Sequence, residues 1–240
     1  MRLPAAKLLA LLLLWSSMAC AVDGQITNLS GAVVAKRGEG QTRILSLKSA
    51  VSEGDIIATS VNSYVRIKFA DGAEIVLRPN TQLKIDAYKY SEQPSESENM
   101  AVSLLKGGLR TVTGLLGRRN PGAFKLSTPN ATIGIRGTHF GALFCSSDCA
   151  GVTLPGGGAP PNGLHVDVAD GVIVVSTKAG SAEFRVGQTG YVASANVPPV
   201  VVPPQQGIRV TLPPQSSSNQ TQPGSVGGVG RGNDQECAIK

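Results

Sequence analysis

Apolar and polar residues alternate over many short stretches of the chain, with the period of two that is typical of half-buried β-strands. The clearest example is residues 64–69, where valine, isoleucine and phenylalanine alternate with arginine and lysine. The dipeptide Asp71-Gly72 follows and favours a tight turn, and residues 73–77 resume the alternation. The pattern therefore predicts a β-hairpin over residues 64–77.

A second informative stretch, residues 128–144, contains two apolar half-strands on either side of a corner at Arg136-Gly137-Thr138. Glycine at the corner permits a backbone conformation that a β-carbon resists. We interpret Arg136 as structural, with its guanidinium donating hydrogen bonds to backbone carbonyls where the chain changes direction. A binding role for this arginine is the alternative interpretation.

Short strands and turns are expected over most of the remaining sequence, because its 29 glycines and 15 prolines are typical of an all-β chain with tight turns. The further strand-like stretches are residues 31–35, 44–51, 82–88, 102–105, 109–116, 124–127, 164–168, 172–176, 183–186 and 189–192. Glu53-Gly54-Asp55 suits a turn whose carboxylates bond backbone amides. Gly107-Gly108 is expected to turn the chain.

The dipeptide Asp170-Gly171 repeats the turn chemistry of residues 71–72. Apolar residues flank it on both sides, so we predict a second hairpin over residues 164–176. Two similar hairpins do not make a regular repeat, and no fixed period extends along the chain.

The beginning of the sequence, residues 1–21, is typical of a cleavable export signal. Two basic residues precede an apolar run over residues 8–15, and Ala19-Cys20-Ala21 supplies the small residues that a signal peptidase requires. The apolar run is too short to span a bilayer. We therefore predict a periplasmic or secreted protein that does not span the membrane. A lipoprotein acylated at Cys20 is the alternative.

In an oxidising compartment, Cys145 and Cys149 could close a small disulfide ring, which is our default interpretation. A metal site is less favoured, because only His139 and His165 exist to complete a four-ligand zinc site. A redox-active pair usually has two residues between its cysteines, whereas this pair has three. Cys237 is left over, either free or available for pairing between chains.

After residue 195 the composition changes. Residues 197–204 favour an extended polyproline conformation, and residues 213–232 are rich in serine, glutamine and glycine. Residues 208–212 could add one edge strand. We therefore divide the chain into a signal peptide over residues 1–21, a β domain over residues 27–195, and a proline-rich linker with a disordered low-complexity tail over residues 196–240.

Taken in order, the motifs of the β domain resemble the FecR domain family. The residues that carry the resemblance are Gly54, Asp55, Asp71, Gly72, Arg136, Gly137, Thr138, Asp170 and Gly171. The resemblance implies an all-β extracytoplasmic module. In the best-known members this module follows a cytoplasmic anti-sigma segment and one transmembrane helix, and it relays contact with an outer-membrane TonB-dependent transducer to a sigma factor. This sequence departs from that pattern, because we find only a cleavable signal.

We expect a β-solenoid-like arrangement of short strands, with a β-sandwich as the alternative. The favoured function is a non-catalytic, exported protein-binding module in cell-envelope signalling or assembly. Its partner would be a TonB-dependent receptor or a membrane regulator, bound through pairing with edge strands or through loop contacts. The sequence leaves the oligomeric state open. The alternatives are a structural or adhesive surface protein, and a protein that binds or hydrolyses envelope polymers.

Catalysis is not expected, because neither His139 nor His165 lies in a nucleophile elbow or a triad context. No cofactor-binding residue and no metal ligand is expected either. The net charge is +6, but the sequence contains no block of basic residues interleaved with aromatic residues. Nucleic acid is therefore not an expected partner.

Overall fold

The structure is a computed structural model that describes residues 22–149 and 151–210. The predicted signal peptide, Cys20, Cys237 and the tail from residue 211 onward lie outside these described residues. None of the helices in the described part of the chain has the length and hydropathy needed to cross a bilayer.

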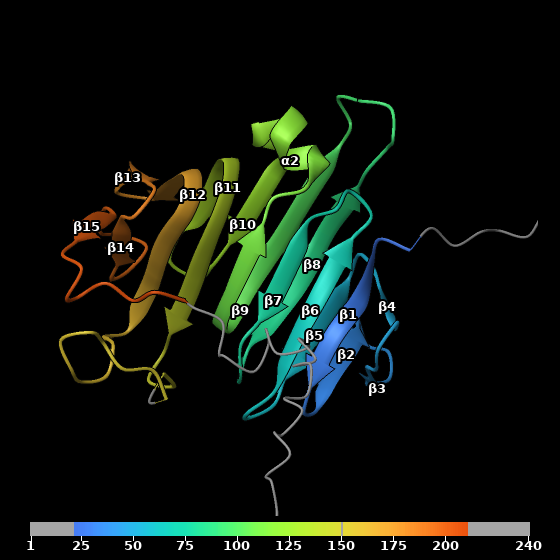
Figure 1. Cartoon of the computed structure of the whole chain (residues 1–240), viewed down its shortest axis with the longest axis horizontal. Helices are drawn as coiled ribbons and strands as arrows, with labels where there is room; N and C mark the ends of the chain where they lie inside the picture. Colours follow the sequence, from blue (N-terminus) through green and yellow to red (C-terminus); the bar gives the residue numbers. More distant parts are fainter. Residues whose placement is uncertain (1–21, 150, 211–240) are drawn as a thin grey trace, which may run out of the picture.

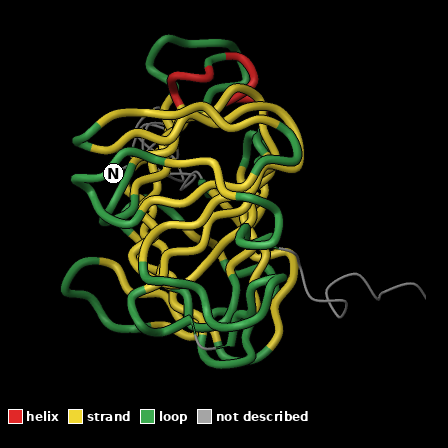
Figure 2. The backbone as a smooth tube through the Cα atoms, turned by 90° about the vertical axis from the view of Figure 1, so that its left-hand side faces the viewer, coloured by secondary structure: helices red, strands yellow, loops and turns green. Residues whose placement is uncertain are grey.

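Strands make up most of the described residues (Figure 1). They are β1 (Gly24–Ser30), β2 (Val33–Arg37), β3 (Arg43–Ile44), β4 (Ala50–Val51), β5 (Asp55–Thr59), β6 (Tyr64–Phe69), β7 (Glu74–Leu77), β8 (Gln82–Lys89), β9 (Asn99–Val112), β10 (Phe124–Ser127), β11 (Thr132–Cys145), β12 (Gly163–Thr177), β13 (Gly180–Arg185), β14 (Thr189–Val192) and β15 (Val200–Val202). A short helix, α2 (Leu115–Arg119), and a 3-10 turn, η2 (Pro121–Ala123), follow β9. Figure 2 shows both at one end of the strands.

The strands belong to one open sheet, so the predicted all-β class is confirmed. Among the described residues all strand pairs are antiparallel except β9 with β10. Strands lie side by side along the long axis of the molecule, from β15 at one end to β4 at the other (Figure 1). The solenoid-like arrangement is not confirmed, because the strands join laterally in this single open sheet.

The sheet forks at β9 into two arms. The first half of β9 pairs with β8 and β10, whereas its second half pairs with β7 and β11. The first arm therefore holds β8, β5, β2 and β3, and the second arm holds β7, β6, β1 and β4. Beyond β9, the strands β11 and β12 also run through both arms. β13 then continues the first arm, and β14 and β15 continue the second.

One hydrophobic cluster joins the two arms. It takes fully buried side chains such as Ile57 and Leu83 from the first arm, and Ile67 and Ile75 from the second. Strands β5, β6 and β8 bury alternate residues, so each of these strands turns one face to the shared core. A smaller cluster lies apart from this core and consists of Leu143, Cys145, Cys149, Ile208 and Val210.

The predicted hairpin over residues 64–77 is present as β6 and β7, with the turn at Asp71-Gly72. The second predicted hairpin, over residues 164–176, is wrong. β12 runs through Asp170-Gly171 without reversing, because its partner β11 stays paired with it on both sides of this point. The positive φ of Gly171, 74°, therefore bends the strand.

The predicted turn at Gly107-Gly108 is wrong for the same reason. β9 continues through it, with φ of 78° at Gly107. β11 likewise is one strand with an irregular register near Gly137, where φ is 57°, and not two strands joined by a corner.

The expected role of Arg136 at this bend is also wrong. Its side chain is exposed and makes no hydrogen bond to a described residue. Thr113 serves the bend instead: its amide and its hydroxyl donate to the carbonyl of Thr138 at 3.0 and 2.7 Å, and its Oγ1 accepts from the Thr138 amide at 3.0 Å. The short, buried side chain of Thr113 therefore makes the backbone hydrogen bonds that the sequence pattern predicts for the long, exposed side chain of Arg136.

The expected domain boundary at residue 195 is too early. β15 pairs with β14, and Ile208 and Val210 are buried at 3% and 2% exposure. The linker predicted from composition thus contributes a strand and two buried side chains of the smaller hydrophobic cluster, because its valines and isoleucine pack on apolar surface of the sheet. Residues 208–210 form no strand.

The bends of β11 and β12 allow us to test why glycine is needed at two positions that are neighbours in space, Gly137 and Gly171. A β-carbon on Gly171 would lie 2.1 Å from the carbonyl oxygen of Gly137, whereas one on Gly137 would meet nothing within 4 Å. We expect Gly137→Ala to cost only backbone strain, about 1–2 kcal/mol. Gly171→Ala should cost more than about 3 kcal/mol, because the clash is with backbone. Denaturant unfolding of both variants measures this, and equal losses would contradict the close approach.

Candidate functional site

The outer face of the second arm carries arginines on adjacent segments. Arg66 of β6 and Arg110 of β9 both pair laterally with Val76 of β7, so they lie in one row across the sheet. Arg78 follows β7 directly, and its amide donates to the carbonyl of Gly108 at 2.9 Å. Positive charge is therefore concentrated where the second arm meets the bend of β9.

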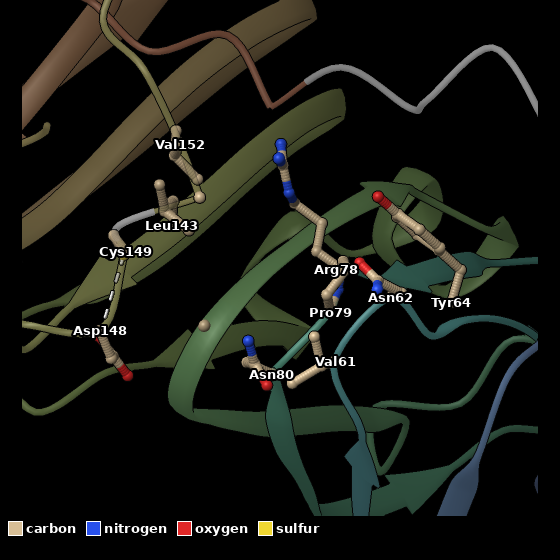
Figure 3. A pocket seen from close by; sticks show the side chains of 12 residues that line it. Val61, Asn62, Tyr64, Arg78, Pro79, Asn80, Leu143, Asp148, Cys149 and Val152 are labelled. Atoms are coloured by element: carbon tan, nitrogen blue, oxygen red, sulfur yellow. Dashed lines mark hydrogen bonds between the residues drawn. The ribbon is translucent and has the colours of Figure 1, made fainter. Parts of the chain in front are cut away.

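A pocket of about 240 Å³ opens beside Arg78 (Figure 3). One side consists of Asn62, Tyr64 and Asn80, from the ends of the β6 and β7 segments. The opposite side is apolar and consists of Leu143, Cys149 and Val152. In Figure 3, the Arg78 side chain extends between Tyr64 and this apolar side.

Local backbone geometry explains why the pocket is open at this place. Asn62 and Asn80 have φ of 58° and 54°, a conformation in which asparagine is enriched. A β-carbon on Gly108 would lie 2.8 Å from Cδ1 of Leu143 and 3.2 Å from Cδ of Arg78. Glycine here lets both side chains lie close over the strand.

The apolar side is held by a covalent bond. Cys145 and Cys149 form a disulfide with their Cα atoms 5.5 Å apart, as the sequence predicted. The ring places Cys149 against Leu143, Ile208 and Val210 in the smaller hydrophobic cluster. This wall of the pocket therefore depends on the disulfide as well as on β11.

Arg78 makes no side-chain hydrogen bond and no ion pair within the described part of the chain. It is half-buried. Burial lowers its pKa, and the neighbouring Tyr64 and Asp167 act in the opposite direction. Since a guanidinium stays protonated in proteins, Arg78 presents to the pocket a cation that has no direct ion-pair partner among the described residues.

Asp167 is the carboxylate that faces these arginines. Burial raises its pKa, and the Val210 amide, which donates to its Oδ1 at 3.0 Å, together with Arg110, Arg209 and Arg78, opposes that rise. None of the three guanidinium groups forms an ion pair with Asp167 within 4.0 Å among the described residues. One carboxylate thus balances three cations from a distance.

His139 lies beside this group. Arg110 Nε donates to His139 Nε2, which requires a neutral imidazole. Burial lowers the pKa of His139, and the positive charge of Arg110 lowers it further. The histidine is therefore a hydrogen-bond acceptor for the arginine, and among the described residues its ring bonds to no serine, threonine or cysteine.

The family-motif residues lie elsewhere and perform structural tasks. Asp71 is 2% exposed, and its Oδ1 accepts from the Ala73 amide at 3.1 Å and the Tyr88 hydroxyl at 3.2 Å. Its Oδ2 accepts from the Leu116 amide at 3.3 Å. Burial, followed by the charge of Asp71, raises the pKa of Tyr88. Asp71 thus connects the β6–β7 turn to β8 and to α2.

Asp55, at the start of β5, forms a similar centre. Arg37 and Arg43 contact its two carboxylate oxygens at 2.9 and 2.6 Å, and the Ser52 amide donates to it at 3.0 Å. Gly54 beside it has φ of 85°, which fits the predicted turn.

The motif residues of β11 and β12 do come together. Asp170 pairs with His139 across the two strands, and Gly171 approaches Gly137 closely. Arg136 lies opposite Val172. Sequence analysis missed Arg78 and Asp167, since each is a single charged residue in a strand pattern and their proximity arises only through the fork of the sheet.

These features define a class of protein: an all-β sheet module in which Asp-Gly and Arg-Gly-Thr motifs shape turns and bends. The family model described as FecR protein matches residues 55–159. The match confirms the resemblance to the FecR family that was found in the sequence. The relationship suggests a signalling-related regulatory module with protein partners.

Two solved structures are similar to the chain. Both are crystal structures of a candidate anti-sigma factor from Parabacteroides distasonis ATCC 8503, with TM-scores of 0.45 and 0.46 and identities of 14% and 15%. The matches cover 61% of this chain and 58% of those chains, so the similar part spans less than two thirds of their length. No curated protein matches the chain.

A buried histidine of the second arm provides a pH test. His165 is 2% exposed, its Nε2 lies 2.9 Å from the Pro161 carbonyl oxygen, and its Nδ1 has no hydrogen-bond partner among the described residues. Burial lowers the pKa of His165 from its ordinary value of 6.5, and the bond to Pro161 opposes this shift. The unfolded chain therefore binds a proton at a higher pH than the folded chain does.

We expect the free energy of unfolding to fall as the pH is lowered from about 7 to about 5, because protonation then favours the unfolded state. Above the ordinary pKa this loss should be absent. Denaturant unfolding over this pH range, with an NMR titration of the imidazole, measures the effect. An imidazole that titrates at or above its ordinary pKa in the folded protein would contradict it.

Proposed function

We propose that the chain is a non-catalytic, exported binding module that engages a protein partner in cell-envelope signalling. The FecR domain over residues 55–159 supports a regulatory role. Periplasmic or secreted localisation is part of this proposal and rests on the signal-like residues 1–21. The partner class that fits the family is a TonB-dependent receptor or a membrane regulator.

The observation that carries the proposal is the unpaired edge of β13. This strand pairs with β12 on one side, and no described strand pairs with its other side. The Arg185 amide donates to Oε1 of Gln188 at 2.6 Å, so it points away from β12. Because amide directions alternate along an antiparallel strand, the amides of Ser181 and Glu183 also point away from β12.

An edge of this kind can receive a strand from a partner by backbone hydrogen bonding. The opposite end of the sheet has fewer backbone groups for pairing with a partner strand, since β3 and β4 have two residues each. β15 is flanked by Pro199 and Pro203, and prolines next to an edge strand hinder further pairing. β13 is therefore the edge that we assign to partner binding.

A proline substitution tests this edge without removing the β12 pairing. Glu183→Pro deletes an outward amide, and we expect capture of the envelope partner to drop at least about fivefold, because a backbone hydrogen bond and the approach of a strand are both lost. Glu183→Ala is the matched control: both variants lose the ion pair with Arg185, 2.6 Å in length, but alanine keeps the amide.

The measurement is crosslinking and capture from envelope extract with the full chain, followed by identification of the bound protein. Capture of a TonB-dependent receptor or membrane regulator by the parent and Glu183→Ala, but not by Glu183→Pro of unchanged melting temperature, supports the proposal. Recovery of only glycans or peptidoglycan fragments, or equal capture by both variants, overturns it.

A further inference from the structure

We propose that the pocket beside Arg78 binds a small ligand or chain end through an oxyanion, a carboxylate or a phosphate, that pairs with the Arg78 guanidinium. This inference goes beyond the proposed partner binding, because the pocket and β13 belong to different arms and can be tested separately. It rests on an arginine that lacks an acceptor, on an excess of positive charge, and on the shape of the pocket.

The first observation is the contrast between Arg78 and the structural arginines of this chain. Arg37 and Arg43 both contact the carboxylate of Asp55, at 2.9 and 2.6 Å. Arg78 is half-buried and contacts no acceptor among the described residues. A guanidinium has five N–H donors, and leaving them unpaired away from water costs free energy. An acceptor arriving from outside would remove that cost.

The second observation is the balance of charge around the pocket. Arg78, Arg110 and Arg209 all act on the single carboxylate of Asp167. Asp167 does not line the pocket; the carboxylate that does, Asp148, lies 3.5 Å from Lys106 and is directed away from Arg78 in Figure 3. The side that Arg78 faces is therefore positive, which favours an anionic ligand.

The third observation is the arrangement of polar and apolar groups. In Figure 3, the Tyr64 hydroxyl extends to the same side of the pocket as the guanidinium, and Asn62 lies next to the base of the Arg78 side chain. These groups can donate to the oxygens that do not contact Arg78. Leu143 and Val152 across the pocket offer an apolar surface.

The volume limits the ligand. A pocket of about 240 Å³ admits only a compact ligand. It therefore fits an oxyanion with a short apolar body, such as an acylated amino acid or the end of a peptide. The apolar wall would hold that body while the guanidinium holds the oxyanion in a two-bond fork.

The test is isothermal titration of the full chain with two probes, N-acetyl-leucine for a carboxylate with an apolar body and inorganic phosphate for a bare anion. We expect at least one probe to bind saturably, and Arg78→Gln to weaken that binding at least about tenfold. Arg66→Gln is the matched control. It removes the same charge from the same face but does not line the pocket, and we expect a change below about twofold.

Arg78→Lys provides a second variant should Arg78→Gln fold poorly, because it keeps the charge and loses the planar fork. Weaker binding by Arg78→Lys at an unchanged melting temperature supports the proposal. Binding of N-acetyl-leucine alone assigns a carboxylate ligand, and binding of phosphate alone assigns a phosphate ligand. No saturable binding of either probe, or equal losses in Arg66→Gln and Arg78→Gln, overturns it.

Discussion

The architecture depends on backbone bends inside long strands. β9, β11 and β12 each contain a glycine with positive φ and each pairs with different neighbours before and after it. A strand that bends in this way belongs to both arms, so the arms are joined covalently as well as by their core. Because β11 and β12 are partners, their bends must coincide, which is why Gly171 lies so close to Gly137.

Charge is used in two different ways on this framework. The buried carboxylates of Asp55 and Asp71 each accept several hydrogen bonds, and they fix two different turns. Such groups are stable in the interior because their acceptor capacity is filled. The arginines on the outer face of the second arm have no comparable set of acceptors, and this is what separates Arg78 from a structural arginine.

Much of the fold was predictable from local pattern. Alternation and an Asp-Gly dipeptide gave the β6–β7 hairpin, and the spacing of Cys145 and Cys149 gave the disulfide. The same dipeptide chemistry failed at Asp170-Gly171. There, a glycine with positive φ serves a bend, since the following strand segment keeps the same partner. Whether such a glycine reverses or bends a strand is decided by the neighbouring strand, which a single local pattern does not contain.

The candidate site was harder to predict for the same physical reason. Arg78 and Asp167 are 89 positions apart in numbering, and their approach follows from the order of β7, β9, β11 and β12 in the second arm. Thr113 was missed because a threonine at the end of a strand is common, and only the bend of β11 shows what its hydroxyl bonds. The pairing of strands that are distant in sequence brings these side chains together, and local sequence patterns do not contain that information.

The disulfide ring has a further consequence for the outer face. It stabilises one wall of the pocket, whereas the main core consists of side chains from other parts of the sheet. A thiol reductant would therefore loosen the pocket wall and leave the framework standing. The oxidation state of the surroundings would therefore act on the smaller cluster, and so on the proposed Arg78 pocket, more directly than on the main core.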